Sequence, residues 1–296
     1  MPHRVAQTYA REARYRVIEH YRGRYPVKDM CLFFGISRAA YYAWQVCSFR
    51  PDKNVERKEL ILEAYQASRS TYGYRRIGLW LSIHKGIKIN HKAILRLMNE
   101  MGIHSVVRKR KPHTKFSQTC SHFYGNLLQR DFYAARPNQK WSTDISFIPT
   151  KQGWAYLSVI KDLHDSFIAS FAIKQANSVD LVVQSLRNAL ANEKVTDGLI
   201  LHSDQGHQYS SHAYYVLTHE YSISPSMSRR ANCWDNAPVE TFFGCLKEEC
   251  IRQLPLLTFE EVKSTIADYI YFYNYERIQL KTRKTPFEVR CLSGLN

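Results

Sequence analysis

The spacing of apolar residues changes near residue 140. Before that point apolar residues recur every three or four positions, the spacing of helices that bury one face. After it they form short continuous runs rich in β-branched and aromatic residues, which is typical of buried strands. We therefore expect a helical first half followed by an α/β second half.

The first predicted domain, residues 1–50, has the pattern of a helix-turn-helix. Its helical spacing is interrupted at Gly35 and Ser37 and resumes from Arg38 to Trp44. Glycine can end one helix and serine can cap the next, so Arg38 would begin a recognition helix. A small helical domain that touches no DNA fits the same short pattern.

A second helical, helix-turn-helix-like domain is predicted for residues 55–105. Asn90 can cap its last helix, and residues 87–89 form either a small wing or a turn. The faces predicted to be buried carry Ile77, Trp80 and Leu81 on one helix and Ile94, Leu95 and Met98 on the next.

The second half predicts a mixed sheet. The runs WSTDISFIP, WAYLSVIKDL and FIASFAIK, joined by short turns, predict a three-strand antiparallel meander. A helix in SVDLVVQSLRNALANEK, a short strand in GLILHS and a helix near residues 212–219 follow. This order is that of a ribonuclease H-like α/β core, which we assign to residues 139–255, with the first and fourth strands side by side. Residues 256–296 predict a helical and basic tail.

Charge is concentrated in the first half of the chain. The formal net charge is +16, yet residues 1–140 carry 27 Lys and Arg against 9 Asp and Glu, whereas residues 141–296 carry 15 against 17. Residues 106–138 form a predicted basic linker. No run of about 18 apolar residues favours a membrane, so nucleic acid is the expected polyanion. We expect a cytoplasmic, nucleoid-associated protein with reduced cysteines, because there is no CxxC pair and no apolar leader.

Three acidic residues stand where backbone elements would bring them together. Asp144 lies within the first strand, Asp204 follows the fourth, and Glu240 lies in a helix that Asn236 can cap. A charge inside an apolar strand is costly unless something compensates it, and a bound metal ion does so. A buried cap or a salt bridge would be the structural alternative. His202 shares the Asp204 side of its strand, where it fits packing as well as a general-base role.

Several basic residues are candidates for contacts with DNA. Lys247 lies seven positions after Glu240, close to two helical turns, and therefore shares its helix face. The other candidates are Arg38, Arg75, Arg76, Lys92, Arg229 and Arg230, each of which could instead be ordinary solvated surface.

The acidic motifs resemble those of a known family. WSTDISFI, LILHSDQGHQY, SRRANCWDNAPVETFFGCLKEE and YNYERIQLKTRKTP are similar to motifs of bacterial transposases of the insertion-sequence-three group, in the DDE superfamily shared with retroviral integrases. The resemblance covers most of the chain, from YPVKDMCLFFGISRAAYYAW onward. It implies that Asp144, Asp204 and Glu240 are metal-binding catalytic acids. Gln279 departs from the family pattern, which often has histidine there.

The resemblance also implies a reaction and its partners. Two in-line displacements at phosphorus, by water and then by the freed DNA 3′-hydroxyl, would occur without a covalent protein-DNA link. Two Mg²⁺ or Mn²⁺ ions would bind when DNA is bound, with Asp144 bridging them. The expected partners are element ends and target DNA, further copies of the chain, and the product of an upstream reading frame joined by frameshifting.

Three alternatives remain open from the sequence. A nuclease with the same core would cleave without joining, and a DNA-binding regulator would use only the helical first half. The 20 tyrosines also allow a tyrosine recombinase, although no Arg and His constellation accompanies a candidate tyrosine.

Overall fold

The structure is a computed structural model that describes residues 2–48, 52–106, 122–195, 197–229 and 232–293. It divides into two compact units, Met1–Arg57 and Lys58–Asn296. Within the described residues, no helix is both long enough and apolar enough to cross a membrane.

The first unit is a small three-helix domain. Its helices are α1 (Pro2–Tyr21), α2 (Val27–Phe33) and α3 (Arg38–Ser48). Gly35 has φ +63°, the left-handed conformation that glycine adopts without a steric penalty, and the Ser37 hydroxyl accepts a hydrogen bond from the Ala40 amide. Ile18 and Tyr41 are fully buried at its centre. The predicted glycine stop and serine cap are both present.

Three further helices form the second helical domain. They are α4 (Val55–Ala67), α5 (Tyr74–His84) and α6 (His91–Glu100). Asn90 caps α6, as predicted, by accepting a hydrogen bond from the Lys92 amide. Ile94 and Met98 are buried, but Leu95 is exposed and Leu97 is buried instead. Position 97 lies three residues after Ile94 and therefore shares its buried face of the helix. Position 95 directly follows Ile94 and lies on a different face.

A five-stranded mixed sheet organises the remainder of the chain. Its strands are β1 (Lys140–Thr150), β2 (Gly153–Asp162), β3 (Ile168–Lys174), β4 (Ile200–Ser203) and β5 (Ser224–Met227). The spatial order is β3-β2-β1-β4-β5. The pairs β1/β2 and β2/β3 are antiparallel, whereas β1/β4 and β4/β5 are parallel. The sheet has the predicted ribonuclease H-like order, with the first and fourth strands adjacent.

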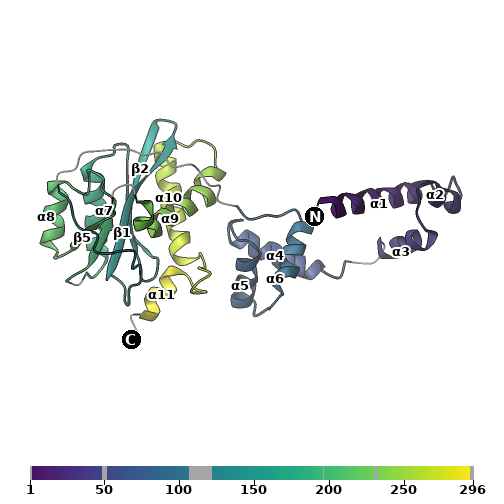
Figure 1. The fold of residues 1–296 in the computed structure, drawn as a ribbon, viewed down its shortest axis with the longest axis horizontal. Helices are drawn as coiled ribbons and strands as arrows, with labels where there is room; N and C mark the ends of the chain where they lie inside the picture. Colours follow the sequence, from purple (N-terminus) through teal and green to yellow (C-terminus); the bar gives the residue numbers. More distant parts are fainter. Residues whose placement is uncertain (1, 49–51, 107–121, 196, 230–231, 294–296) are drawn as a thin grey trace. The chain divides into compact units, whose positions relative to one another are not determined.

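Helices cover both faces of this sheet (Figure 1). The helical segments are α7 (Val179–Asn192), α8 (His212–Glu220), η1 (Cys233–Asn236), α9 (Ala237–Glu249), η2 (Ile251–Gln253), α10 (Phe259–Tyr275) and α11 (Pro286–Ser293). One apolar core lies between the sheet and α9 and α10, and a second lies between the sheet and α7 and α8. On α10, the side chains of Ile266, Tyr269, Ile270 and Tyr273 are all buried in the first core.

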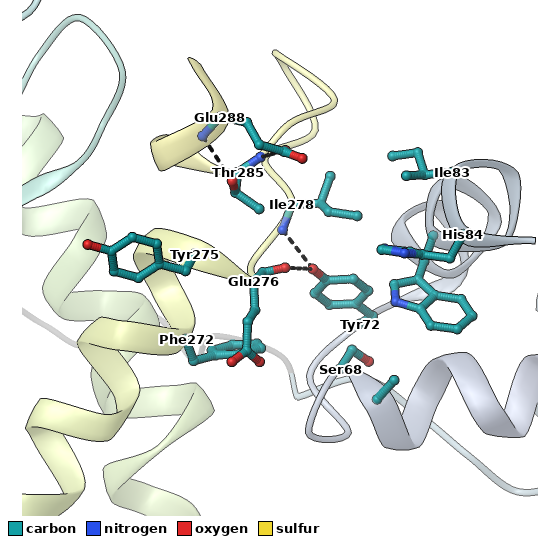
Figure 2. Close-up of a pocket in the computed structure, with 12 residues that line it drawn as sticks. Ser68, Tyr72, Ile83, His84, Phe272, Tyr275, Glu276, Ile278, Thr285 and Glu288 are labelled. Carbon is teal, nitrogen blue, oxygen red and sulfur yellow. Dashed lines mark hydrogen bonds between the residues drawn. The ribbon is translucent and has the colours of Figure 1, made fainter. Parts of the chain in front are cut away.

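The second helical domain contacts the segment that follows α10. The buried Tyr72 hydroxyl accepts a hydrogen bond from the Ile278 amide at 2.7 Å (Figure 2). Arg69 pairs with Asp268 at 2.6 Å, and Ile278 belongs to the same apolar cluster as the core of α4, α5 and α6. This domain and the end of the chain therefore stabilise each other.

Replacing Tyr72 with phenylalanine is expected to lower the free energy of unfolding by about 1 to 3 kcal/mol, because it leaves the buried Ile278 amide without its acceptor. Tyr133, whose side chain is exposed, provides the matched control, and Tyr133→Phe is expected to change little. Urea denaturation of both variants measures the difference. Equal stabilities would show that the Tyr72 hydrogen bond contributes nothing.

Candidate active site

Asp144 and Asp204 lie on adjacent parallel strands. Ser142 on β1 is in register with His202 on β4. Asp144 is two residues beyond Ser142, and Asp204 is two residues beyond His202, just past the end of β4. Parallel strands advance in the same direction, so the register places the two aspartates beside each other at one end of the sheet.

The strand also determines the face on which Asp144 lies. Trp141 and Ile145 pack into the core beneath α7 and α8, whereas Ile148 packs beneath α9. Side chains alternate along a strand, so Asp144 shares the face of Ser142 and Ile148, the face that α9 covers. This is the helix that carries Glu240.

The start of α9 is fixed to β1 beside Asp144. Asn236 accepts a hydrogen bond from the Ser142 hydroxyl at 2.6 Å and donates one to the Thr143 carbonyl at 3.0 Å. The Lys161 ammonium on β2 donates to the Pro238 carbonyl at 3.0 Å. These contacts hold the first turn of α9, and Glu240 within it, against the strand. Asn236 was expected to cap the helix, but its side chain makes no capping hydrogen bond and binds β1 instead.

Asp204 and Glu240 both act electrostatically on Asp144. The pKa of Asp144 is raised well above its ordinary value, first by burial and then by the negative charge of Asp204, with a smaller contribution from Glu240. The Ile145 amide, which donates to the Asp144 carboxylate at 2.8 Å, and the positive charge of Lys247 act in the opposite direction. Asp204, Glu240 and Lys247 therefore all lie within electrostatic reach of Asp144.

The loop after β4 orients Asp204. Its carboxylate accepts a hydrogen bond from the Gly206 amide at 2.9 Å. A Cβ atom at position 206 would lie 2.9 Å from the same carboxylate oxygen, so any other residue there would displace Asp204. Asp204 is exposed at the surface as a whole residue. Burial of its carboxyl group raises the pKa of Asp204, whereas the hydrogen bond from Gly206 lowers it.

Comparisons with known proteins identify the family of this chain. The description "Integrase core domain" matches residues 134–233 and, through a second model, residues 240–292, and "HTH-like domain" matches residues 52–111. InsK of insertion sequence element IS150, from Escherichia coli (strain K12), is 36% identical over 93% of this chain and 97% of its own length. The chain belongs to the insertion-sequence-three family of transposases. The general reaction of this family is DNA cleavage and strand transfer.

A second relative supports the same family. Transposase InsF for insertion sequence IS3A, from the same organism, is 31% identical over 87% of this chain and 90% of its own length. A solved structure of the HTLV-2 integrase catalytic core domain in complex with magnesium is more distant, at 18% identity and a TM-score of 0.41 over 52% of this chain and 97% of that one.

Two further residues lie near the acids of the transposase. The sequence assigned no role to Tyr209 and left His202 open between packing and a general-base role. Tyr209 is fully buried, its hydroxyl lies 3.3 Å from that of Thr143, and burial followed by the charges of Asp144 and Asp204 raises its pKa well above the ordinary value. His202 is fully buried between the hydroxyls of Ser226 and Ser228, and burial lowers its pKa to about 4. His202 is therefore neutral near pH 7 and is held in place by the two serine hydroxyls.

The described residues contain no group of three or more His, Cys, Asp and Glu side chains already arranged to hold a metal ion. A cavity of about 260 Å³ lies beside the Tyr72 contact (Figure 2), and none of the three acids lines it. The three acids of the transposase instead lie where the sheet and α9 meet. The carboxylates of Asp144 and Asp204 each accept a hydrogen bond from a backbone amide.

The basic residues predicted to contact DNA occupy different environments. Arg38, Arg75 and Lys92 are exposed on α3, α5 and α6 respectively. Arg76 is half-buried, with its guanidinium 3.9 Å from Glu249 and over the ring of Tyr72.

Arg76 therefore lies partly against Glu249 of α9, a neighbour that a local pattern cannot reveal. Arg229 is exposed but forms an ion pair with Asp235. Arg230 lies outside the described residues.

Proposed function

We propose that this transposase cleaves and joins DNA at one metal-dependent site formed by Asp144, Asp204 and Glu240. The observation that supports this most directly is the parallel register of β1 and β4, which brings Asp144 and Asp204 to one end of the sheet beside the helix that carries Glu240. Carboxylates that lie close together repel one another when ionised, and burial followed by the charges of Asp204 and Glu240 raises the pKa of Asp144. A divalent cation removes that repulsion, so the donor set fits Mg²⁺ or Mn²⁺.

The chemistry of magnesium explains how such a site functions without a complete protein cage. Mg²⁺ keeps several waters and is commonly bound by one or two carboxylates together with substrate phosphate oxygens. When bound, two such ions would activate the attacking oxygen and stabilise the departing one. We therefore propose that DNA completes the site and that two ions bind once it is present.

The residues of the chain position the acids and the DNA. The Ile145 and Gly206 amides orient the Asp144 and Asp204 carboxylates before any substrate arrives. The contacts of Asn236 and Lys161 fix the helix turn that carries Glu240. Lys247, whose charge acts on Asp144, would contact a DNA phosphate.

The wider organisation follows from the same proposal. The helical domains, assigned to residues 1–50 and 55–105, would bind the element ends, with the basic linker 106–138 leading to the core 139–255 and the tail 256–296. Exposed Arg38, Arg75 and Lys92 would contact phosphates. We further propose that copies of the chain assemble on DNA and that an upstream-frame protein is a partner.

The test incubates the protein with labelled element ends, a target plasmid and Mg²⁺. We expect joined DNA products that form only with Mg²⁺ and that are absent when a chelator is added. Nicks without joining would identify a nuclease, and DNA binding without turnover would identify a regulator. A covalent protein-DNA adduct would replace the proposal with a tyrosine-recombinase mechanism.

A further inference from the structure

Asp235 joins two arginines from separate parts of the chain. Its carboxylate, fully buried, accepts hydrogen bonds from Arg229 Nε and Nη2, both at 2.9 Å, and from Arg130 Nε at 2.7 Å. Asn126 donates to the same carboxylate at 3.1 Å. One carboxylate thus fixes the position of two guanidinium groups, which we refer to as the Arg130/Arg229 pair.

This cluster carries more positive than negative charge. The hydrogen bond from Arg229 holds the pKa of Asp235 well below its usual range, so Asp235 is ionised and contributes one negative charge against two positive charges. The side chains of Arg229 and Arg130 remain 59% and 45% exposed, whereas that of Asp235 is 0% exposed. The excess positive charge therefore faces solvent and is available to an anion from outside the chain.

Arg130 is held rigidly in place. The Leu127 amide donates to the Ser226 hydroxyl at 2.9 Å, which fixes the segment before Arg130 to β5. Arg130 Nη2 also donates to Asn232 Oδ1 at 3.1 Å. Its φ of +64° lies in the left-handed region that non-glycine residues rarely adopt, a conformation that persists only where surrounding contacts enforce it.

The pair lies next to the candidate active site. Asp235 immediately precedes Asn236, whose side chain binds Ser142 and Thr143 on β1, the two residues before Asp144. Glu240 follows one helical turn later. A group bound by the Arg130/Arg229 pair would therefore be close to the acids.

We propose that Arg130 and Arg229 together bind one phosphodiester of the DNA backbone beside the scissile phosphate. Guanidinium groups suit this role because they are planar, permanently charged and able to donate hydrogen bonds to phosphate oxygens in a fixed geometry. Each arginine uses part of its donor set on Asp235, which orients the group for the phosphate. The inference rests on the proposed function, since it assigns the DNA group that this part of the site holds.

The experiment measures how DNA affinity depends on salt for Arg130→Gln, Arg130→Lys and unaltered protein. Loss of one phosphate contact reduces the slope of log affinity against log salt by about 0.9 for duplex DNA. Arg130→Gln is expected to show that reduction, and Arg130→Lys is expected to keep the slope because it keeps the charge. Arg187→Gln, at an exposed position on α7, removes the same charge and is expected to leave the slope unchanged.

Two outcomes would overturn the phosphate contact. An unchanged slope for Arg130→Gln would show that Arg130 only supports the loop through Asp235. A slope lost equally in Arg130→Gln and Arg130→Lys would trace the effect to loop geometry rather than charge. Thermal unfolding of each variant, measured alongside, separates lost stability from lost binding.

These outcomes are distinct from failure of the proposed function. If unaltered protein joins DNA and the slope does not respond to Arg130→Gln, only the phosphate contact is wrong. If no joining occurs under any condition while Arg130→Gln still lowers the slope, the protein binds DNA through this pair without the proposed chemistry.

Discussion

Asp144→Asn is expected to abolish DNA cleavage and joining while leaving DNA binding intact. Asparagine keeps the size of the side chain but removes the negative charge that would hold a divalent cation between β1 and β4. We expect the joining rate to fall by about a thousandfold or more, which corresponds to about 4 kcal/mol of transition-state stabilisation. Counting joined products in a time course with Mg²⁺ measures the loss.

The unfolding temperature of the variant shows whether activity is lost through catalysis or through unfolding. The charges of Asp204 and Glu240 raise the pKa of Asp144, so removing its charge relieves repulsion in the protein without metal. Asp144→Asn is therefore expected to unfold at the same temperature as the unaltered protein or higher. Asp197→Asn, at an exposed position before β4, is the matched control and is expected to retain full activity. Normal cleavage by Asp144→Asn would refute the assignment of Asp144.

The strand and helix order could be predicted because each long element carries its own signal. The strands containing Asp144 and preceding Asp204 are short segments that include β-branched apolar residues, and the ribonuclease H-like order of elements around them predicts that those strands are neighbours. Glu240 was predicted to lie in a helix beginning near Asn236, and α9 does begin there, with a proline tolerated in its first turn. The adjacency of the two aspartates therefore followed from topology, without any contact being visible in the sequence.

The details that escaped prediction depend on partners far away in the chain. From the sequence alone, Asn236 is a candidate helix cap. Only the folded sheet brings Ser142 and Thr143 within hydrogen-bonding distance of its side chain. The strand β5, with the sequence SPSM, is short and lacks β-branched residues, so it has no local strand signal. Arg130 lies 105 positions from Asp235, and no pattern of spacing connects them.

Asn236→Ala is expected to reduce the joining rate by about 10- to 100-fold, the range found when groups that orient metal ligands are removed. The change deletes both hydrogen bonds to β1 and leaves the Ser142 hydroxyl and the Thr143 carbonyl buried without that partner. Each such group costs about 1 to 3 kcal/mol, so the free energy of unfolding falls as well. Rate measurements are therefore made at a temperature where the variant remains folded.

The comparison between Ser142→Ala and Ser158→Ala tests whether the contact positions Glu240 or only stabilises the fold. Both serines are fully buried on neighbouring strands, but Ser158 Oγ has no hydrogen-bond partner in the described part of the chain. Ser158→Ala is expected to leave joining unchanged, whereas Ser142→Ala should lower the joining rate with unchanged DNA affinity, because it frees one side of Asn236. If Ser142→Ala lowered stability but joined DNA at the normal rate, the Asn236 contact would stabilise the fold without positioning the catalytic helix.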